Sequence, residues 1–285
     1  MNIVRRHPLT AFVVIAYGLS WLTLGPFVYL LQVRHGGEFQ AWMLVFLPGA
    51  WGPTLAAFLV TTITSGRAGL GRLLKSFLDW RHNILWWAFV VLAPPATFAA
   101  AMALSNLGLA PLGTISIAQL AASAPLFIAL ALPFGPLGEE FGWRGFATPR
   151  FLESGGAVRA ALLIGTIWTF WHLPLFWLPG ASIPEYLGVT PFSIAAYWAY
   201  ITGLTLIYTA IWLHTNGSVL IAVVFHAMCN ASENILLAAI PGEIADSDRA
   251  PIYLIGIAIS WAIGVPMLAL SASRARALRL AASST

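Results

Sequence analysis

The 285-residue chain is 59% hydrophobic and only 8% charged, and its mean hydropathy is +0.83. Soluble globular proteins carry about 25% charged residues, so this composition excludes an ordinary soluble domain, whose surface it cannot cover. It also excludes a disordered chain, which needs low hydrophobicity and high charge. Cys229 is the single cysteine, which excludes a disulfide framework and a cysteine-built zinc site. The class that remains is a polytopic membrane protein.

Eight apolar stretches are long enough to cross a bilayer, because a spanning helix needs about 20 mostly apolar residues. These stretches cover 10–31, 41–64, 84–105, 117–147, 158–178, 191–213, 217–240 and 251–272. The connections between them are too short to hold a folded soluble domain. We therefore expect an all-α membrane protein of about eight transmembrane helices, in which residues 1–285 form one domain.

The Lys and Arg residues test this count, because cytoplasmic loops collect them. With eight spans both termini lie on one side, and that side receives every basic residue except Arg34 and Arg249. The residues on that side are Arg5, Arg6, Arg67, Arg72, Lys75, Arg81, Arg144, Arg150, Arg159, Arg274, Arg276 and Arg279. The asymmetry predicts cytoplasmic N- and C-termini. Membrane topology also accounts for the pI near 9.6, so the basic charge does not indicate a nucleic-acid partner.

Polar groups at membrane depth are the candidates for a functional site, because ionisable residues are costly there. The three Asp residues, Asp79, Asp246 and Asp248, all fall in predicted loops. The candidates within predicted spans are Glu139, Glu140, Arg144, His172, His226, Asn230 and Glu233. They belong to the fourth, fifth and seventh spans, which places the predicted site between those three helices.

Glu139 and Glu140 stand side by side in the segment GEEFGWRG. Adjacent side chains on a helix point about 100° apart, so only one of the two can face a given site. Glu140 and Arg144 are four residues apart with the acid first, the favoured order for a helical ion pair. We therefore expect this pair to be structural and Glu139 to be the reactive carboxylate. The alternative interpretation is a solvated charge cluster at a cytoplasmic helix end.

The fifth and seventh spans carry the other polar candidates. His172 follows an aromatic segment on an apolar span, where a lone histidine is more often a hydrogen-bonded core residue. His226 and Asn230 are four residues apart and share a helical face, on which both offer hydrogen-bond donors. A structural hydrogen bond between helices is the alternative for this pair. Glu233 extends the same face toward the outer surface, and its role is left open.

The depth of Glu139 depends on where the fourth helix ends, because Pro133 and Pro136 precede it. Helical rise is about 1.5 Å per residue, and Glu139 reaches the depth of the two histidines only if its helix continues through residues 143–146. A helix that stopped at either proline would leave the carboxylates at the surface. We expect a helix that continues past both prolines with a kink there.

Three motifs in chain order resemble those of the CPBP family: Glu-Glu-x-x-x-Arg at 139–144, aromatic-x-x-x-His at 168–172 and His-x-x-x-Asn at 226–230. This family comprises the CAAX-processing intramembrane endopeptidases and the Abi proteins associated with bacteriocin immunity. Each motif alone is weak, but the three together are specific, and they lie in a family core at 117–240. Trp168 replaces the usual Phe of the second motif, a change expected to affect packing and not chemistry.

The resemblance implies a role for each motif residue: water activation by Glu139 and His172, an oxyanion hole from His226 and Asn230, and support from Glu140 and Arg144. It also raises the question of a metal, because Glu139, His172 and His226 are a ligand set that suits catalytic zinc. The sequence has no His-Glu-x-x-His segment. Zinc-bound water and water held directly by Glu and His both stay open, and the metal-free mechanism is slightly favoured.

The expected function is hydrolysis of a peptide bond near the C-terminus of a protein or peptide substrate, which the resemblance suggests is prenylated or membrane-proximal. We expect a cavity that faces the cytoplasm and is entered from the inner leaflet of the membrane, the plasma membrane in a bacterium. Two alternatives are kept. One is a proton-coupled carrier that uses the same Glu and His residues as a relay. The other is a catalytically silent immunity-type membrane protein.

Overall fold

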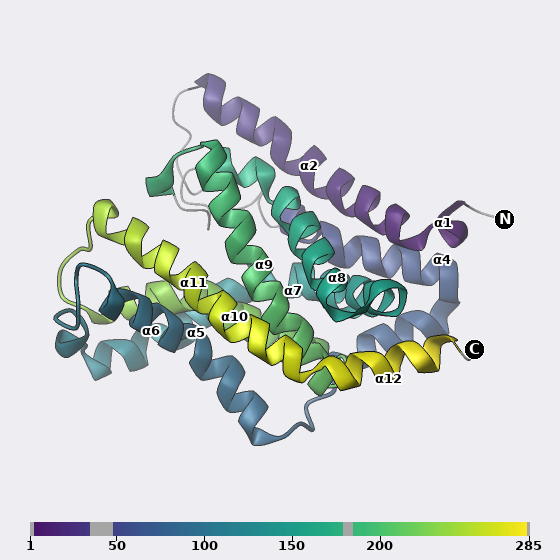
Figure 1. Cartoon of the computed structure of the whole chain (residues 1–285). Coiled ribbons are helices and arrows are strands. Elements are labelled where there is room, and N and C mark those ends of the chain that lie inside the picture. The colour runs from purple at the N-terminus through teal and green to yellow at the C-terminus, as the bar shows by residue number, and fades with distance from the viewer. Residues whose placement is uncertain (1–2, 35–47, 179–184, 284–285) are drawn as a thin grey trace.

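The computed structural model describes residues 3–34, 48–178 and 185–283, and within these ranges the chain forms helices and turns without a strand (Figure 1). The helices are α1 (Ile3–Arg6), α2 (Pro8–Arg34), α4 (Gly52–Lys75), α5 (Ile84–Leu104), η1 (Leu112–Thr114), α6 (Ile117–Phe134), α7 (Pro136–Glu140), η2 (Phe141–Ala147), α8 (Thr148–Trp171), η3 (Leu173–Trp177), η4 (Glu185–Leu187), α9 (Pro191–His214), α10 (Val219–Ala239), α11 (Asp246–Leu270) and α12 (Ala272–Ser283). The expected all-α membrane fold is confirmed.

The expected count of eight spans is not confirmed. Six segments among the described residues are long and apolar enough to cross a membrane: Pro8–Pro26, Ile84–Leu104, Ile117–Trp177, Pro191–His214, Val219–Ala239 and Asp246–Leu270. The third of these is 61 residues long and covers two of the expected spans. The expected span at 41–64 falls partly outside the described residues, and α4 runs beyond it to Lys75 through Arg67 and Arg72.

The bundle has two ends, which the hydrogen bonds between its connections define. At one end Val219 N donates to the Ser76 carbonyl over 3.1 Å, and His214 Nε2 lies 3.1 Å from Ser271 Oγ. Both chain termini and α12 lie on this side of the molecule (Figure 1). We call it the basic end, because the connections at this end and the terminal helices carry most of the Lys and Arg residues.

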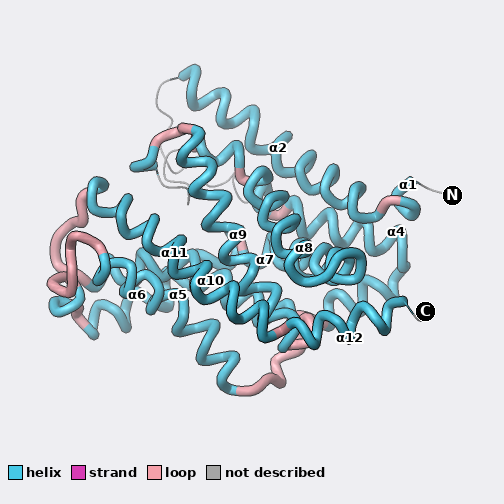
Figure 2. Tube along the Cα trace, viewed as in Figure 1, coloured by secondary structure: helices cyan, strands magenta, loops and turns pink. Residues whose placement is uncertain are grey.

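The distal end lies opposite and holds the α5–α6 and α10–α11 connections, which are loops in Figure 2. There the backbone N–H of Ser116 donates to the Ala239 carbonyl over 2.8 Å. Asn106 Nδ2 donates to Asp248 Oδ1 over 2.6 Å. These bonds tie the start of α6 to the end of α10 and the end of α5 to the start of α11.

The chain around the two glutamates is not one continuous helix, which corrects the expectation for the fourth span. Helix α6 ends at Phe134, Gly135 breaks it, and α7 starts at Pro136, which is tolerated in a first helical turn because its missing N–H is not needed there. The next seven residues, Phe141–Ala147, form a π-helix. The carboxylates are nevertheless buried, because the restarted helix runs into the core and not along the surface.

A second bend positions the histidine of the fifth span. Helix α8 contains Gly156 at φ +79°, a left-handed conformation that glycine adopts without the cost a side chain would add. From this bend the helix runs between α9 and the π-helix, buries Trp168 and Trp171, and ends at Trp171, with His172 as its C-cap residue. Helix α10, the expected seventh span, packs against α5, α6 and α7. It therefore lies next to the short helix that carries the two glutamates.

Candidate active site

The paired glutamates are both buried but face different surroundings. Glu139 is 3% exposed and Glu140 is fully buried. Both sit on the short helix α7, where Gly138 has no room for a side chain because a Cβ would lie 2.5 Å from the Ala50 carbonyl oxygen. This close approach to the backbone preceding α4 presses α7 into the core. The alternative of a solvated charge cluster is therefore wrong for these two residues.

One oxygen of Glu139 is held by two indoles. Trp143 Nε1 donates to Oε2 over 3.1 Å, and Trp168 Nε1 donates to the same oxygen over 2.5 Å. Both indoles are 1% exposed, so the bonds lie away from competing water. The clamp fixes the carboxylate plane and leaves Oε1 as the oxygen that faces the cavity.

Glu140 belongs to a buried network of charged and aromatic groups. Arg144 Nη1 donates to its Oε1 over 3.0 Å, and His226 Nδ1 lies 2.6 Å from the same oxygen. The guanidinium is sandwiched between aromatic rings, with its central carbon 4.2 Å from the Trp168 ring centroid and 3.5 Å from that of Tyr208. Since Arg cannot lose its proton in a protein, the carboxylate has a permanent positive partner. The expected Glu140–Arg144 ion pair is confirmed.

His172 is oriented through the residue that also binds Glu139. Its Nδ1 lies 2.8 Å from the Trp168 carbonyl oxygen, which can only accept a hydrogen bond. Nδ1 therefore carries a proton, and in the neutral ring Nε2 has a lone pair that is free to accept. The ring packs edge-on against Trp171 and Tyr197 at centroid distances of 4.7 and 5.4 Å. Trp168 thus fixes both the glutamate, through its side chain, and the histidine, through its backbone.

Three polar atoms converge at Gly135, at the break between α6 and α7. A methyl carbon placed on this glycine would lie 3.1 Å from Asn230 Nδ2, 3.3 Å from Glu139 Oε1 and 3.4 Å from His226 Nε2. A basic oxygen and two nitrogen atoms on groups that can donate therefore face one small volume, which a side chain at position 135 would fill. The structure brings together Glu139, His226 and Asn230 here.

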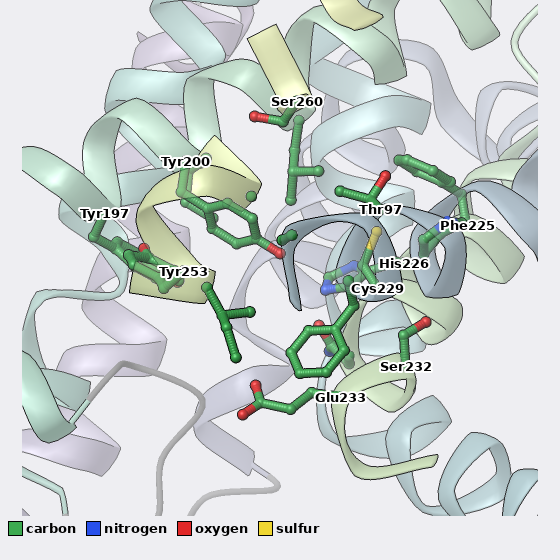
Figure 3. Close-up of a pocket in the computed structure, with 18 of the residues that line it drawn as sticks. Thr97, Tyr197, Tyr200, Phe225, His226, Cys229, Ser232, Glu233, Tyr253 and Ser260 are labelled. Carbon is green, nitrogen blue, oxygen red and sulfur yellow. The ribbon is translucent and has the colours of Figure 1, made fainter. Parts of the chain in front are cut away.

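These groups line a cavity of about 520 Å³. Its lining includes Glu139, His172, His226 and Asn230, together with apolar residues of α5 and α11. Figure 3 looks into this cavity and shows His226, Cys229 and Glu233 along one wall, with tyrosines of α9 and α11 on another. The arrangement combines a carboxylate, an accepting imidazole nitrogen and two donors in a space that holds several residues of a peptide.

Comparisons with known proteins agree with this geometry. Residues 121–232 match the family described as type II CAAX prenyl endopeptidase Rce1-like. CAAX prenyl protease 2 of Methanococcus maripaludis is 26% identical over 232 residues, which cover 76% of this chain and 81% of the relative. Both matches support the resemblance of this chain to the CPBP family. Neither a carrier nor a silent immunity protein is favoured by these matches.

The three motifs account for the residues predicted from sequence, and the structure adds three that were not predicted and a further role for Trp168. Trp143 lies four residues after Glu139, a spacing that signals the contact on a helix. Trp168 corrects the expectation that its exchange for Phe affects packing alone, because its indole N–H binds the catalytic candidate directly. Tyr208, on α9, carries no motif that marks it. Gly135 is marked only by its place before Pro136 at the helix break.

Glu139, His172 and His226 as arranged here do not fit a three-ligand zinc site. Within 3–34, 48–178 and 185–283, no three His, Cys, Asp or Glu side chains gather closely enough to hold one metal ion. Two indoles occupy one oxygen of Glu139, while the Nδ1 bonds of His172 and His226 leave both Nε2 atoms free, as in zinc-bound histidines. The side chains therefore lie too far apart as arranged here, and their spacing gives the proposed ligand set no support.

Proposed function

We propose that this protein is an intramembrane endopeptidase whose water nucleophile is activated directly by Glu139 and His172. The observation that carries the proposal is the convergence of Glu139 Oε1, His226 Nε2 and Asn230 Nδ2 beside Gly135. Hydrolysis of an amide needs a base for water and donors for the oxyanion, and these groups supply both within one small volume. Resemblance to the CPBP family supports the same activity.

In the proposed reaction the scissile carbonyl carbon lies beside Gly135. Water donates one hydrogen bond to Glu139 Oε1 and another to Nε2 of His172, which has the lone pair to accept it. As the water oxygen bonds to the carbonyl carbon, its proton passes to Glu139 and the carbonyl becomes an oxyanion. When the C–N bond breaks, Glu139 returns that proton to the leaving amine, so the base is regenerated.

The oxyanion is stabilised by the N–H groups of His226 Nε2 and Asn230 Nδ2. Each well-placed donor of this kind contributes about 3–4 kcal/mol to the transition state. His226 serves as a donor at Nε2 when its ring carries a proton on each nitrogen, with Nδ1 facing Glu140 Oε1 over 2.6 Å. The proposed role of Glu140 and Arg144 is therefore to hold His226 in orientation and charge.

The proposed substrate is a protein or peptide segment near the membrane, cleaved close to its C-terminus. The name of the Methanococcus relative supports a prenylated CAAX segment. The apolar walls of α5 and α11 suit such a lipid-bearing chain. We also propose that the chain spans the membrane with both termini in the cytoplasm, as the distribution of Lys and Arg indicates.

The test is cleavage of peptides by the purified full-length protein in detergent or liposomes. A farnesylated CAAX-type peptide and its unmodified counterpart are offered to the wild type and to Glu139→Gln, with metal content measured on the same sample. We expect cleavage by the wild type and none by the variant. Cleavage retained in Glu139→Gln would refute the mechanism, and no cleavage of either peptide by the wild type would refute the substrate.

A further inference from the structure

A second hollow lies at the basic end, apart from the active-site cavity. Its volume is about 230 Å³, and no candidate catalytic residue is among the described residues that line it. Its walls come from α4, the π-helix, the start of α8 and the turn between α9 and α10. Two lining residues, Ser76 and Gly217, directly follow the end of α4 and closely precede the start of α10. The hollow therefore lies where the helices reach the membrane surface.

Two arginines line this hollow, and the described lining contains no Asp or Glu. Arg72 is exposed on the last turn of α4, and Arg150 is half-buried on the first turn of α8. Neither forms a salt bridge with any residue in the part of the chain that the structure describes. The exposed carboxylate of Glu153 acts on the charge of Arg150 but lies outside the lining. The lining therefore presents a positive charge that has no counter-charge within the hollow.

The guanidinium of Arg150 is held in place and keeps donors to spare. Its Nη1 donates to the Phe146 carbonyl over 2.7 Å, and its central carbon lies 3.7 Å from the centroid of the Phe146 ring. Its Nε and Nη2 have no acceptor among the described residues. These two nitrogens form one edge of a planar fork, which binds phosphate or carboxylate oxygens in pairs. The edge is thus oriented before any anion arrives.

The break in α4 supplies further donors. Gly66 has φ +62°, and the helix restarts after it, with Ser65 and Gly69 on either side of the break lining the hollow. The first turn of a helix presents backbone N–H groups and a partial positive charge, both of which favour an anion. Asn216, in the turn between α9 and α10, is exposed and lines the hollow from the opposite wall. Its side-chain amide offers two more N–H groups.

Trp212 indicates what kind of anion reaches this place. It lines the hollow, and its Nε1 donates to the Arg144 carbonyl over 3.1 Å. Tryptophan is enriched at the membrane–water interface, which is the depth of the phospholipid headgroups. Basic pockets between membrane helices are typical sites for anionic headgroups. A phosphate group fits a hollow of this size, and the acyl chains would lie outside it.

We infer that the hollow at the basic end binds the phosphate headgroup of an anionic phospholipid, with Arg150 and Arg72 as its main ligands. The inference goes beyond the proposed peptidase function and does not depend on it. Trp212 joins the hollow to the backbone of the π-helix that carries Arg144. A bound headgroup therefore stabilises the segment on which the Glu140–Arg144 pair depends.

Thermal stability in the presence of defined lipids tests the inference, because a ligand that binds the folded state raises the melting temperature. Purified full-length protein in neutral detergent is titrated with phosphatidylglycerol, and unfolding is followed by tryptophan fluorescence. Phosphatidylcholine with the same acyl chains and inorganic phosphate are titrated in parallel. The test variant combines Arg72→Gln with Arg150→Gln. The matched control combines Arg274→Gln with Arg276→Gln, which removes two exposed charges from α12 at the same end.

We expect a saturable rise in melting temperature with phosphatidylglycerol. Its midpoint should move to an about tenfold or higher lipid concentration in the test variant, because hydrogen bonds to a charged group are lost, and should not move in the control. Equal shifts in both variants would overturn the inference by showing diffuse attraction to the basic surface. An equal rise with phosphatidylcholine or with inorganic phosphate would overturn the assignment to an anionic lipid.

Arg150→Gln also removes the bond to the Phe146 carbonyl, so Arg72→Gln is measured alone as well. The Arg72 side chain makes no hydrogen bond to a described residue, and we expect its loss to leave the melting temperature without lipid unchanged. The midpoint for phosphatidylglycerol should still rise. An unchanged midpoint in this variant would overturn the role given to Arg72 and, with it, the two-arginine site.

Discussion

Glu139 and Glu140 are neighbours in sequence, equally buried and chemically identical, yet their surroundings differ at every contact. Glu140 meets a permanent cation and an imidazole in a packed network. Glu139 meets two neutral indoles at one oxygen and presents the other to the cavity. Helical geometry makes the difference, because adjacent side chains diverge by about 100°. Burial alone therefore does not mark a catalytic carboxylate, whereas an oxygen left to face a cavity does.

The largest expected effect comes from removing the charge that faces the cavity. Glu139→Gln keeps the shape and one acceptor oxygen but cannot take a proton from water. We expect kcat to fall by about 10²–10⁴-fold, the range for loss of a general base, with an unchanged melting temperature. Glu153→Gln, on the exposed surface of α8, is the matched control. A melting temperature that fell along with kcat would place Glu139 in the same structural class as Glu140.

Glu140→Gln tests the other half of the comparison. Breaking a buried ion pair by removing one partner costs about 3–5 kcal/mol, because the other charge is left uncompensated. We expect a lower melting temperature in detergent, followed by tryptophan fluorescence, together with lost activity because His226 loses its partner. An unchanged melting temperature would contradict the structural role given to the pair.

Gly135→Ala places a methyl group where the three polar atoms converge. Since misplacement of a reacting group by about 1 Å can cost about 10²-fold in rate, we expect a kcat loss of about that size. The melting temperature should stay close to that of the wild type. Gly71→Ala is the control, because a Cβ at Gly71 meets no atom within 4 Å. Full activity in Gly135→Ala would show that the reacting carbonyl does not lie beside this residue.

Trp168→Phe restores the residue usual in the second motif and deletes one donor to Glu139. A hydrogen bond to a charged group contributes about 1.5–3 kcal/mol, so a loss of about tenfold or more in kcat follows if the clamp orients the base. Trp198→Phe removes an indole bond to Thr166 Oγ1 at an exposed site and serves as the control. Equal activities of the two variants would show that Trp168 contributes to packing and does not orient Glu139.

The smallest expected effect is that of chelation. Because the proposed water is held by Glu139 and His172 without a metal, dialysis against EDTA or phenanthroline should leave kcat unchanged. Elemental analysis of the active sample checks the same point. Activity that is lost on chelation and restored by zinc would replace the proposed mechanism with a metal-dependent one.

Much of the site could be predicted from the sequence because local spacing encodes it. The Glu140–Arg144 pair and the shared face of His226 and Asn230 both follow from a four-residue interval on a helix. The membrane class follows equally from composition.

The contacts that complete the site join segments far apart in the chain. The bond from His226 to Glu140 spans 86 residues, and that from Trp168 to Glu139 spans 29. Tertiary packing determines such pairs, and periodicity does not report it. The break at Gly135 was missed for a related reason, since a proline pattern indicates a kink but not where the chain resumes.

The π-helix at Phe141–Ala147 has a consequence for how the chain tolerates change. Its wider turn accommodates the Trp143 carbonyl, which accepts from the backbone N–H and the hydroxyl of Thr148, five residues ahead. It therefore sets the angular phase between α7 and α8. Deleting one residue here would return the segment to α-helical winding and rotate Trp168 and His172 relative to Glu139. This stretch is a spacer of fixed length, in which substitutions are tolerated more readily than insertions or deletions.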